Sequence, residues 1–294
     1  MSLAPRPTGR SPRRATRARA RLGLAATALA HALAVPALAG DPADSAGAGR
    51  DSSDIAASIQ VPPPGEHEVL PAPEHPFRVG ESLRFSVQWK FAHAGTAWLQ
   101  VPEQVDVNGR PALHLVARAE SNTFVSMIYK VRNRIESTWD RDGHFSWRYA
   151  EHRREGGFRA ENEVQFDYTT RTARYQDGKI SAIPEHCQDA LSAFYYTRTQ
   201  ALPIGGSIVF DYHASHRSMP LEVKVLGRDH VKVPAGSFDC VVVEPVLKAG
   251  GIFKNKGRLL IWLTADDRRI PVLMRSKVTI GSVDVILQDY REGA

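Results

Sequence analysis

Apolar and polar residues alternate along most of the chain downstream of residue 76. The pattern is clearest near the C-terminus, where an apolar run at 259–263 meets a polar turn and alternating stretches follow at 270–275 and 283–287. A period of two, interrupted by turn residues at short intervals, is typical of antiparallel strands with one buried face. We therefore expect a three-stranded meander over residues 257–290, around which a larger sheet is built.

The same alternation recurs upstream and predicts about thirteen strands in all. Asn108-Gly109 and Asp142-Gly143 are typical hairpin turns. Farther along, the patterns of Pro220–Leu226 and His230–Val233 predict a hairpin that turns at Gly227-Arg228-Asp229. All-β chains of this length commonly form one domain, and we expect one here.

One segment departs from the period of two. In residues 189–198 the apolar and long side chains recur every third or fourth position, which predicts a short amphipathic helix, and Asp189 suits its N-cap. The positions with this spacing are Leu191, Phe194, Tyr195 and Arg198. A strongly curved antiparallel sheet must fill its concave side, and this helix is the natural filler. We therefore predict a mainly β fold, a large curved antiparallel sheet or partly open β-barrel packed on one short helix.

Residues 1–39 have the features of a secretory signal peptide. An arginine-rich start precedes the apolar segment Leu22–Val35, and Ala37-Leu38-Ala39 supplies small residues for cleavage. The apolar segment is shorter than the ~20 residues of a membrane-spanning helix. Residues 40–75 are rich in Gly, Ala, Ser, Asp and Pro, which predicts a disordered linker. We expect a single β-rich domain over 76–294 that is exported and is membrane-proximal but not membrane-spanning.

The formal net charge of +6 comes from the leader. Seven of the 38 basic residues and none of the 32 acidic ones lie in residues 1–39, so the rest of the chain is close to neutral. This removes the main compositional argument for nucleic-acid binding. Arg13-Arg14 raises the alternative of a twin-arginine signal, although the residues that follow lack the usual apolar pair.

Residues 130–159 hold eight basic and five acidic residues with aromatic side chains interleaved. A polyanion or an anionic lipid surface could use such a stretch. Strands with charged outer faces produce the same pattern, and we favour that interpretation.

The chain has two cysteines, Cys187 and Cys240. In an oxidising compartment an isolated pair favours a disulfide. Closing a loop of this length contributes about 4 kcal/mol in the chain-entropy model. We predict a Cys187–Cys240 disulfide; the alternative is two buried thiols that act as small apolar residues.

No catalytic, cofactor-binding or metal-binding motif stands out. Ser192 has no local signature of a nucleophile, and we interpret it as a helix-surface serine. His213 and His216 converge on a metal only if their segment turns. The segment Glu185–Asp189 clusters four possible metal ligands, two of which the helix cap and the disulfide explain. The acidic pair Asp266-Asp267 resembles a carboxylate pair for acid/base chemistry, but it is more simply a solvated turn.

Several segments in combination resemble a known family. They are Phe77–Trp89, the helical stretch 189–198, Val233–Pro245 and Gly257–Leu287. Together they resemble the bacterial domain-of-unknown-function family 3108 (DUF3108) over about Pro76–Glu292. The resemblance implies an exported proteobacterial β-rich domain with a helix, and so a place in the periplasm of a Gram-negative bacterium. It brings no catalytic residues.

Export, the all-β pattern and the single apolar helix favour a non-enzymatic binding or carrier domain for a lipid or other apolar ligand of the cell envelope. Tyr195, Trp262 and Met274 are the candidates for lining its cavity. Two alternatives stay open: an envelope hydrolase that uses Ser192 or the His213/His216 pair, and a structural or assembly partner that offers a sheet edge to an envelope protein. A deep apolar cavity favours the carrier, a polar cleft with perturbed titratable groups favours the hydrolase, and neither feature favours the assembly partner.

Overall fold

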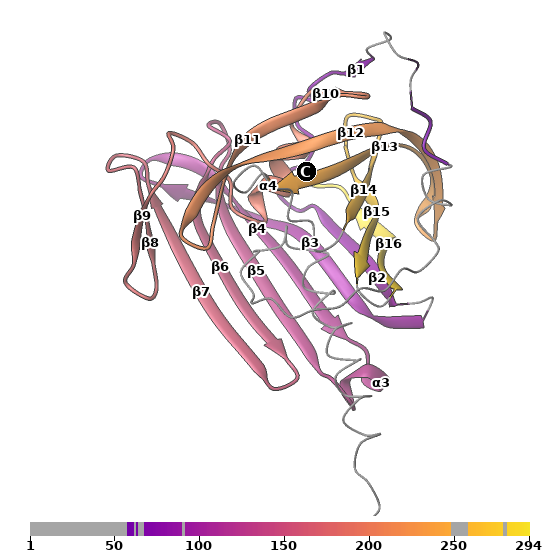
Figure 1. The fold of residues 1–294 in the computed structure, drawn as a ribbon, viewed down its shortest axis with the longest axis horizontal. Coiled ribbons are helices and arrows are strands. Elements are labelled where there is room, and N and C mark those ends of the chain that lie inside the picture. Colours follow the sequence, from indigo (N-terminus) through magenta and orange to yellow (C-terminus); the bar gives the residue numbers. More distant parts are fainter. Residues whose placement is uncertain (1–57, 62, 64–67, 90–91, 248–257, 279–280) are drawn as a thin grey trace, which may run out of the picture.

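The chain forms an antiparallel β structure that wraps around one short helix (Figure 1). The computed structural model describes residues 58–61, 63, 68–89, 92–247, 258–278 and 281–294. Strands β1 to β8 are Val69–Leu70, Ser82–Trp89, Ala92–Val107, Arg110–Ser121, Val131–Asp140, Ser146–Glu155, Phe158–Asp167 and Thr172–Tyr175. Strands β9 to β16 are Ile180–Ala182, Leu202–Pro203, Ser207–Ala214, Arg217–Val233, Gly236–Leu247, Leu259–Thr264, Pro271–Val278 and Gly281–Arg291. Helices α3 and α4 are Thr123–Ser126 and Ser192–Arg198.

Fourteen strands form one sheet in the order β11-β12-β13-β14-β15-β16-β2-β3-β4-β5-β6-β7-β8-β9, and β1 pairs with β10 in a second, small sheet. The C-terminal strand β16 pairs with β2, where Val285 lies opposite Val87, so the two ends of the domain meet inside the sheet. The predicted meander is β14–β16, and it lies within the sheet rather than at an edge. The expected mainly β fold, a large antiparallel sheet packed on a short helix, is confirmed.

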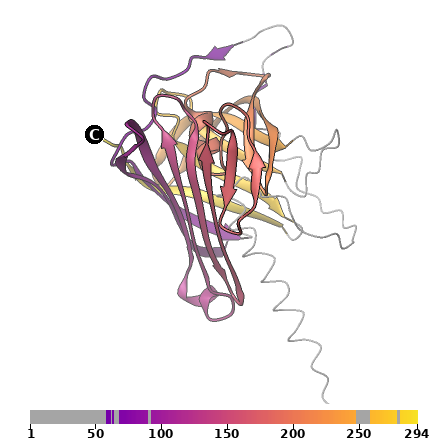
Figure 2. The ribbon, with the colours of Figure 1, turned by 90° about the vertical axis from the view of Figure 1, so that its left-hand side faces the viewer.

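The sheet curls until its two edge strands, β9 and β11, come together (Figure 2). His213 Nε2 lies 3.3 Å from Ser181 Oγ of β9, and Ser218 Oγ donates to the carbonyl of Ala182 at 3.5 Å. Over the residues that the structure describes, no backbone ladder joins β9 to β11, so the sheet is not closed into a barrel. We call the side-chain contact of His213, Ser181 and Ser218 the seam.

Helix α4 lies on the concave side of the sheet, and buried charges hold both of its ends. At its start, Asp189 Oδ1 accepts the N–H groups of Leu191 and Ser192 at 2.7 and 2.8 Å, as the predicted capping role requires. At its end, the fully buried Arg198 donates to both carboxylate oxygens of Glu81, at 2.8 and 2.7 Å. The helix is therefore fixed to the sheet at two places.

Asp189 also fastens the helix start to the middle of the sheet. Its Oδ2 accepts the hydroxyls of Ser137, at 2.5 Å, and of Ser146. Burial raises the pKa of this carboxyl, while the hydroxyl and backbone donors around it favour the charged form.

The hairpin predicted at Gly227-Arg228-Asp229 is wrong, because β12 runs through these residues as one strand with an irregularity between Val225 and Gly227. The bulge brings the strand against an N-terminal segment, where Gln60 pairs with Arg228. A turn tripeptide and a bulge share the same residue types, so the sequence pattern does not distinguish them.

We expect Gly227→Ala to cost about 1–3 kcal/mol of stability and to release the segment around Gln60. A Cβ at Gly227 would lie 2.3 Å from the carbonyl oxygen of Gln60, which is backbone and cannot rotate away. Limited proteolysis near residue 60 and urea unfolding measure both effects. Gly157→Ala is the matched control, since nothing lies within 4 Å of the Cβ it would add, and equal behaviour of the two variants would contradict this account.

The predicted linker 40–75 is wrong in its C-terminal part. Val69–Leu70 pairs with Leu202–Pro203 of β10, and Leu70 is buried. Arg269 Nη2 donates to the carbonyl of Pro71 at 3.0 Å. A two-residue strand between prolines has no pattern of its own, and its order comes from these tertiary partners. Residues 1–57, which include the expected leader, lie outside the described residues.

The predicted Cys187–Cys240 disulfide is also wrong in this structure, where both cysteines are free, buried thiols. Cys187 Sγ lies 3.6 Å from Tyr168 Oη, whereas Cys240 Sγ lies 3.5 Å from the carbonyl of Phe238 on its own strand. Burial raises the pKa of each thiol to about 12. The alternative of two small apolar core residues therefore holds.

Candidate functional site

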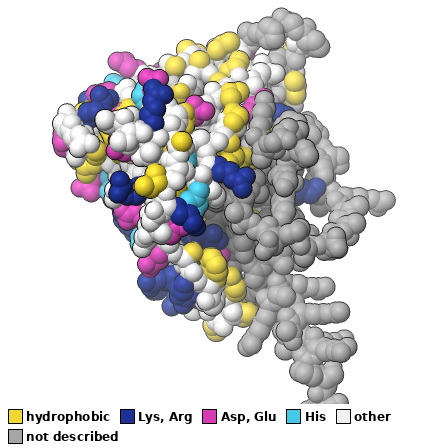
Figure 3. Space-filling model, turned by 60° about the vertical axis from the view of Figure 1, so that its left-hand side comes forward, with side chains coloured by type: hydrophobic (Ala, Val, Ile, Leu, Met, Phe, Trp, Pro, Cys, Tyr) yellow, Lys and Arg dark blue, Asp and Glu magenta, His cyan; other side chains and the backbone are white. Residues whose placement is uncertain are grey.

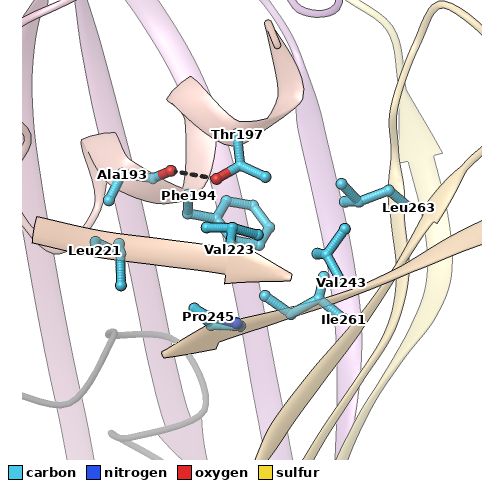
Figure 4. A pocket seen from close by; sticks show the side chains of 9 residues that line it. All are labelled: Ala193, Phe194, Thr197, Leu221, Val223, Val243, Pro245, Ile261 and Leu263. Carbon is cyan, nitrogen blue, oxygen red and sulfur yellow. Dashed lines mark hydrogen bonds between the residues drawn. The ribbon is translucent and has the colours of Figure 1, made fainter. Parts of the chain in front are cut away.

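An apolar pocket lies between α4 and the three neighbouring strands β12, β13 and β14 (Figure 4). Its lining residues are Ala193, Phe194, Thr197, Leu221, Val223, Val243, Pro245, Ile261 and Leu263. Thr197 carries the one polar side chain of this set, and its hydroxyl already donates to the carbonyl of Ala193 at 2.9 Å. The lining side chains therefore offer apolar surface and no free hydrogen-bond donor.

The period of two explains which strand residues face this pocket. Val243 lies opposite Ile261, and Val223 lies opposite Pro245, in neighbouring antiparallel strands. Directly opposed residues of an antiparallel pair point to the same face of the sheet. The strands therefore present a continuous apolar wall to α4. Phe194 projects from α4 toward this wall (Figure 4).

The pocket is narrow in this conformation. Its volume is about 20 Å³, which is room for the centres of one or two water molecules. An acyl chain needs more space, so a ligand must displace at least one lining side chain. Phe194 is the candidate, because it is half-buried and rotatable, whereas the strand residues other than Pro245 are buried.

The three residues predicted to line a cavity are buried, but none is among the lining residues of this pocket. Tyr195 packs edge-on against Phe77, with ring centroids 4.8 Å apart. Trp262 donates from Nε1 to Asp229 Oδ2 at 2.8 Å, and Met274 is buried in the core.

The lining residues are direct chain neighbours of the predicted ones. Phe194 precedes Tyr195, and Ile261 and Leu263 flank Trp262. A shift of one residue along a strand moves a side chain to the opposite face. Because β14 is apolar on both faces, its sequence pattern does not show which face meets the helix.

A second, more polar hollow of about 40 Å³ lies next to the seam. It is lined by Tyr149, Glu151, Asn162, Val164, Phe166, Tyr175, Ala190, Tyr212, His213, Ala214 and Ser215. The Nε2 of His213 lies 2.8 Å from Tyr175 Oη, and its Nδ1 lies 2.7 Å from Ser218 Oγ. Burial, helped by the nearby His216, lowers the pKa of His213 to about 4. The imidazole is therefore neutral at ordinary pH and serves as a hydrogen-bonding group of the seam.

The residues of the hydrolase alternative do not assemble into a nucleophile and its base. Ser192 is fully buried, and its hydroxyl accepts the N–H of Asp189 at 2.8 Å rather than contacting a histidine. His216 stacks on the ring of Tyr175, with centroids 3.9 Å apart, while His213 bonds to Ser218 on its other side. This geometry gives Ser192 no general base.

The candidate metal ligands of the segment Glu185–Asp189 do not converge on one point either. His186 stacks on Phe145, with centroids 4.7 Å apart, while Asp189 is buried beneath the helix. The acidic pair Asp266-Asp267, weighed for acid/base chemistry, lies in a turn, where Asp266 accepts the Thr264 hydroxyl at 2.6 Å and pairs with Arg268 at 2.5 Å. Among the described residues, no three His, Cys, Asp or Glu side chains are placed to hold a metal ion.

The profile of the family described as "Protein of unknown function (DUF3108)" matches residues 84–288. The chain belongs to the DUF3108 family. The match runs from β2 to β16 and includes every wall of the apolar pocket, and it confirms the membership that the sequence resemblance predicts. No curated protein matches this DUF3108 chain. In the part of the chain that the structure covers, no helix is long and apolar enough to cross a bilayer.

This DUF3108 protein is similar to solved structures at low sequence identity. A β-barrel-like protein of the DUF1849 family from Brucella abortus is similar with a TM-score of 0.51 and 9% identity, over 74% of this chain and 98% of that chain. A protein provisionally described as a lipoprotein, from Parabacteroides distasonis, has a TM-score of 0.34 and 10% identity, over 75% and 99%. A protein provisionally described as exported, from Bacteroides fragilis, has a TM-score of 0.28 and 10% identity, over 75% and 100%. At 9% identity, the first similarity concerns the fold alone.

Proposed function

We propose that this DUF3108 protein is a non-enzymatic carrier that binds the acyl chain of a lipid, or a similar apolar ligand, between α4 and strands β12–β14. The composition of the pocket carries the proposal. Its side chains offer no free hydrogen-bond donor and one hydroxyl oxygen as acceptor, so a polar ligand gains little there. An apolar chain gains roughly 25 cal/mol for each Å² of surface that it buries.

The proposed place of action is the periplasm. The leader expected at residues 1–39 would export the chain to that compartment, where lipids in transit must cross water. A carrier that shields an acyl chain needs a wall of apolar side chains and a side chain that can move aside to make room for the ligand. Strands β12–β14 supply the wall.

The part that moves aside is Phe194 rather than the whole helix. Arg198 and Glu81 fix the end of α4, and the carboxylate of Asp189 fixes its start. Phe194 lies between these two anchors and is half-buried, so its ring can swing out while the helix stays in place. The ligand would take the space of the ring.

Phe194→Ala is expected to bind cis-parinaric acid more tightly, on the order of ten-fold, because binding no longer requires moving a ring. This fatty acid fluoresces more strongly in apolar surroundings, so titration gives the affinity directly. Val223→Phe fills the pocket and is expected to weaken binding by a similar factor, with an overpacking cost of about 1–3 kcal/mol in stability.

Phe238→Ala is the matched control. It removes an equally large, half-buried ring that packs near Tyr290, outside the pocket, and it should leave binding unchanged. Circular dichroism verifies that all three variants are folded. An affinity that is the same in the parent chain and in every variant would overturn the proposed site.

A further inference from the structure

Four large apolar side chains are exposed together at the end of strands β4–β7 that lies near α3. Phe124, Met127 and Ile128 belong to α3 and the residues after it, and their exposed fractions are 69%, 72% and 52%. Phe158, at the start of β7, is 50% exposed. We call these four side chains the apolar tip. Helix α3 and the turn between β6 and β7 lie at the lower end of the sheet, as Figures 1 and 2 show from two directions.

The segment that follows α3 packs directly on the turn between β6 and β7. The N–H of Gly156 donates to the carbonyl of Lys130 at 2.8 Å. The ring of Tyr129 lies so close that a Cβ at Gly156 would be 2.7 Å from it. The guanidinium of Arg153 covers the ring of Phe158 at 5.4 Å. The apolar tip is therefore built on a fixed support.

Arginines lie side by side next to this tip. Arg132 is in register with Arg154, and Arg154 with Arg159, so three exposed guanidinium groups line up across β5, β6 and β7. We call these three residues the arginine row. Over the described part of the chain none of them forms a side-chain ion pair; Arg159 donates to the carbonyls of Gly156 and Phe158 instead. Glu120, opposite Arg132, is the one acidic residue in register with the row.

Like charges directly opposite one another destabilise a sheet, so the arginine row is not explained by folding. The exposed Lys130 adds a further cation beside it. Figure 3 shows Lys and Arg side chains gathered next to apolar ones at the lower end of the molecule. This end of the protein therefore has unpaired positive charge on the outer face of the sheet and exposed apolar side chains at its tip, where Phe158 points to the opposite face of β7 from Arg159.

We propose that this end of the protein docks on an anionic lipid surface. The apolar tip would enter the boundary between headgroups and acyl chains, and the arginine row would contact lipid phosphates, which guanidinium groups bind bidentately. Each signal alone is weak, and stable membrane association takes two. An exposed apolar tip fits a soft lipid surface, whereas a folded protein partner would require a matching hollow.

Docking is measured by co-sedimentation with vesicles of mixed phosphatidylglycerol and phosphatidylcholine, and with vesicles of phosphatidylcholine alone. The protein is used as recovered from cells that express the full chain. Removing the row by R132Q, R154Q and R159Q is expected to weaken binding to the anionic vesicles about five-fold for each arginine, about 100-fold in all. Replacing the four tip residues with serine is expected to weaken it by a factor on the order of ten or more.

Matched controls lie at the opposite end of β7 and beyond. Ile180→Ser and Val209→Ser remove side chains that are 58% and 56% exposed, and Arg174→Gln and Arg217→Gln remove exposed charges. These changes should leave vesicle binding within about two-fold of the parent, because a distant charge is screened. Cis-parinaric acid binding by the tip and row variants should be unchanged, which separates docking from the proposed carrier function.

Three results would overturn the proposal. The first is equal binding to neutral and anionic vesicles. The second is an equal loss in the control variants. The third is retention on a soluble polyanion such as heparin with no sedimentation on vesicles, which would assign the arginine row to a polyanion instead.

Discussion

Replacing Glu81 with glutamine is expected to lower the free energy of unfolding by about 3–5 kcal/mol, because it leaves a buried guanidinium without its counter-charge. Arg198 is fully buried and also donates to the carbonyls of Pro76 and Arg268, at 3.0 and 3.1 Å. The rings of Phe77 and Tyr195 lie 4.9 and 5.3 Å from its guanidinium carbon. Urea unfolding of the two proteins measures the difference.

Asp289→Asn is the matched control for this prediction. Asp289 pairs with Arg84 on the surface, where both side chains are half exposed, and such pairs contribute about 0–1 kcal/mol. The double replacement Glu81→Leu, Arg198→Met should cost less than Glu81→Gln alone, because neither charge remains buried. If Glu81→Gln cost no more than Asp289→Asn, the helix anchor would not be the buried pair.

Acidification from pH 6.5 to about 4 is expected to remove on the order of 2–3 kcal/mol of stability through His213 alone. Burial lowers the pKa of His213 to about 4, from 6.5 when the chain is unfolded. The unfolded state therefore binds a proton in this window and the folded state does not. Stability from His213 is complete above pH 6.5 and is lost as the pH falls.

His213→Gln tests this prediction, because glutamine is polar and does not titrate. The groups that face His213 are Tyr175, Ser181, Ser218 and Phe166, with His216 nearby. Urea unfolding at both ends of the window, in parent and variant, isolates the contribution of His213. A pH dependence of the same size in the two proteins would rule out His213 as its source.

Much of the fold can be predicted from the sequence because burial on one face imposes a period of two. The meander β14–β16, the position of α4 and the capping by Asp189 follow from such local signals. The bulge at Gly227 and the short strand at Val69–Leu70 do not, since both depend on a partner far away in sequence. The free thiols cannot be predicted from the sequence either, because the spacing of two cysteines does not show which neighbours each one packs against.

From the sequence we can predict which helix and which strand form the candidate site, but not which of their residues line it. The sequence points to the helix and to the strand that carries Trp262, and both contribute to the pocket. It does not distinguish Phe194 from Tyr195, or Ile261 from Trp262, because neighbouring residues are all apolar and the deciding fact is which face meets the helix. The arginine row is equally hidden, since only the strand register places Arg132, Arg154 and Arg159 side by side.

Native mass spectrometry of the protein, recovered gently from cells that express the full chain, tests the carrier function most directly. A carrier should show a discrete adduct of lipid mass that denaturation releases, and a smaller fraction of that adduct in Val223→Phe. A mass without adduct in the parent chain, or an adduct that Val223→Phe leaves unchanged, would contradict a lipid in the pocket between α4 and β12–β14.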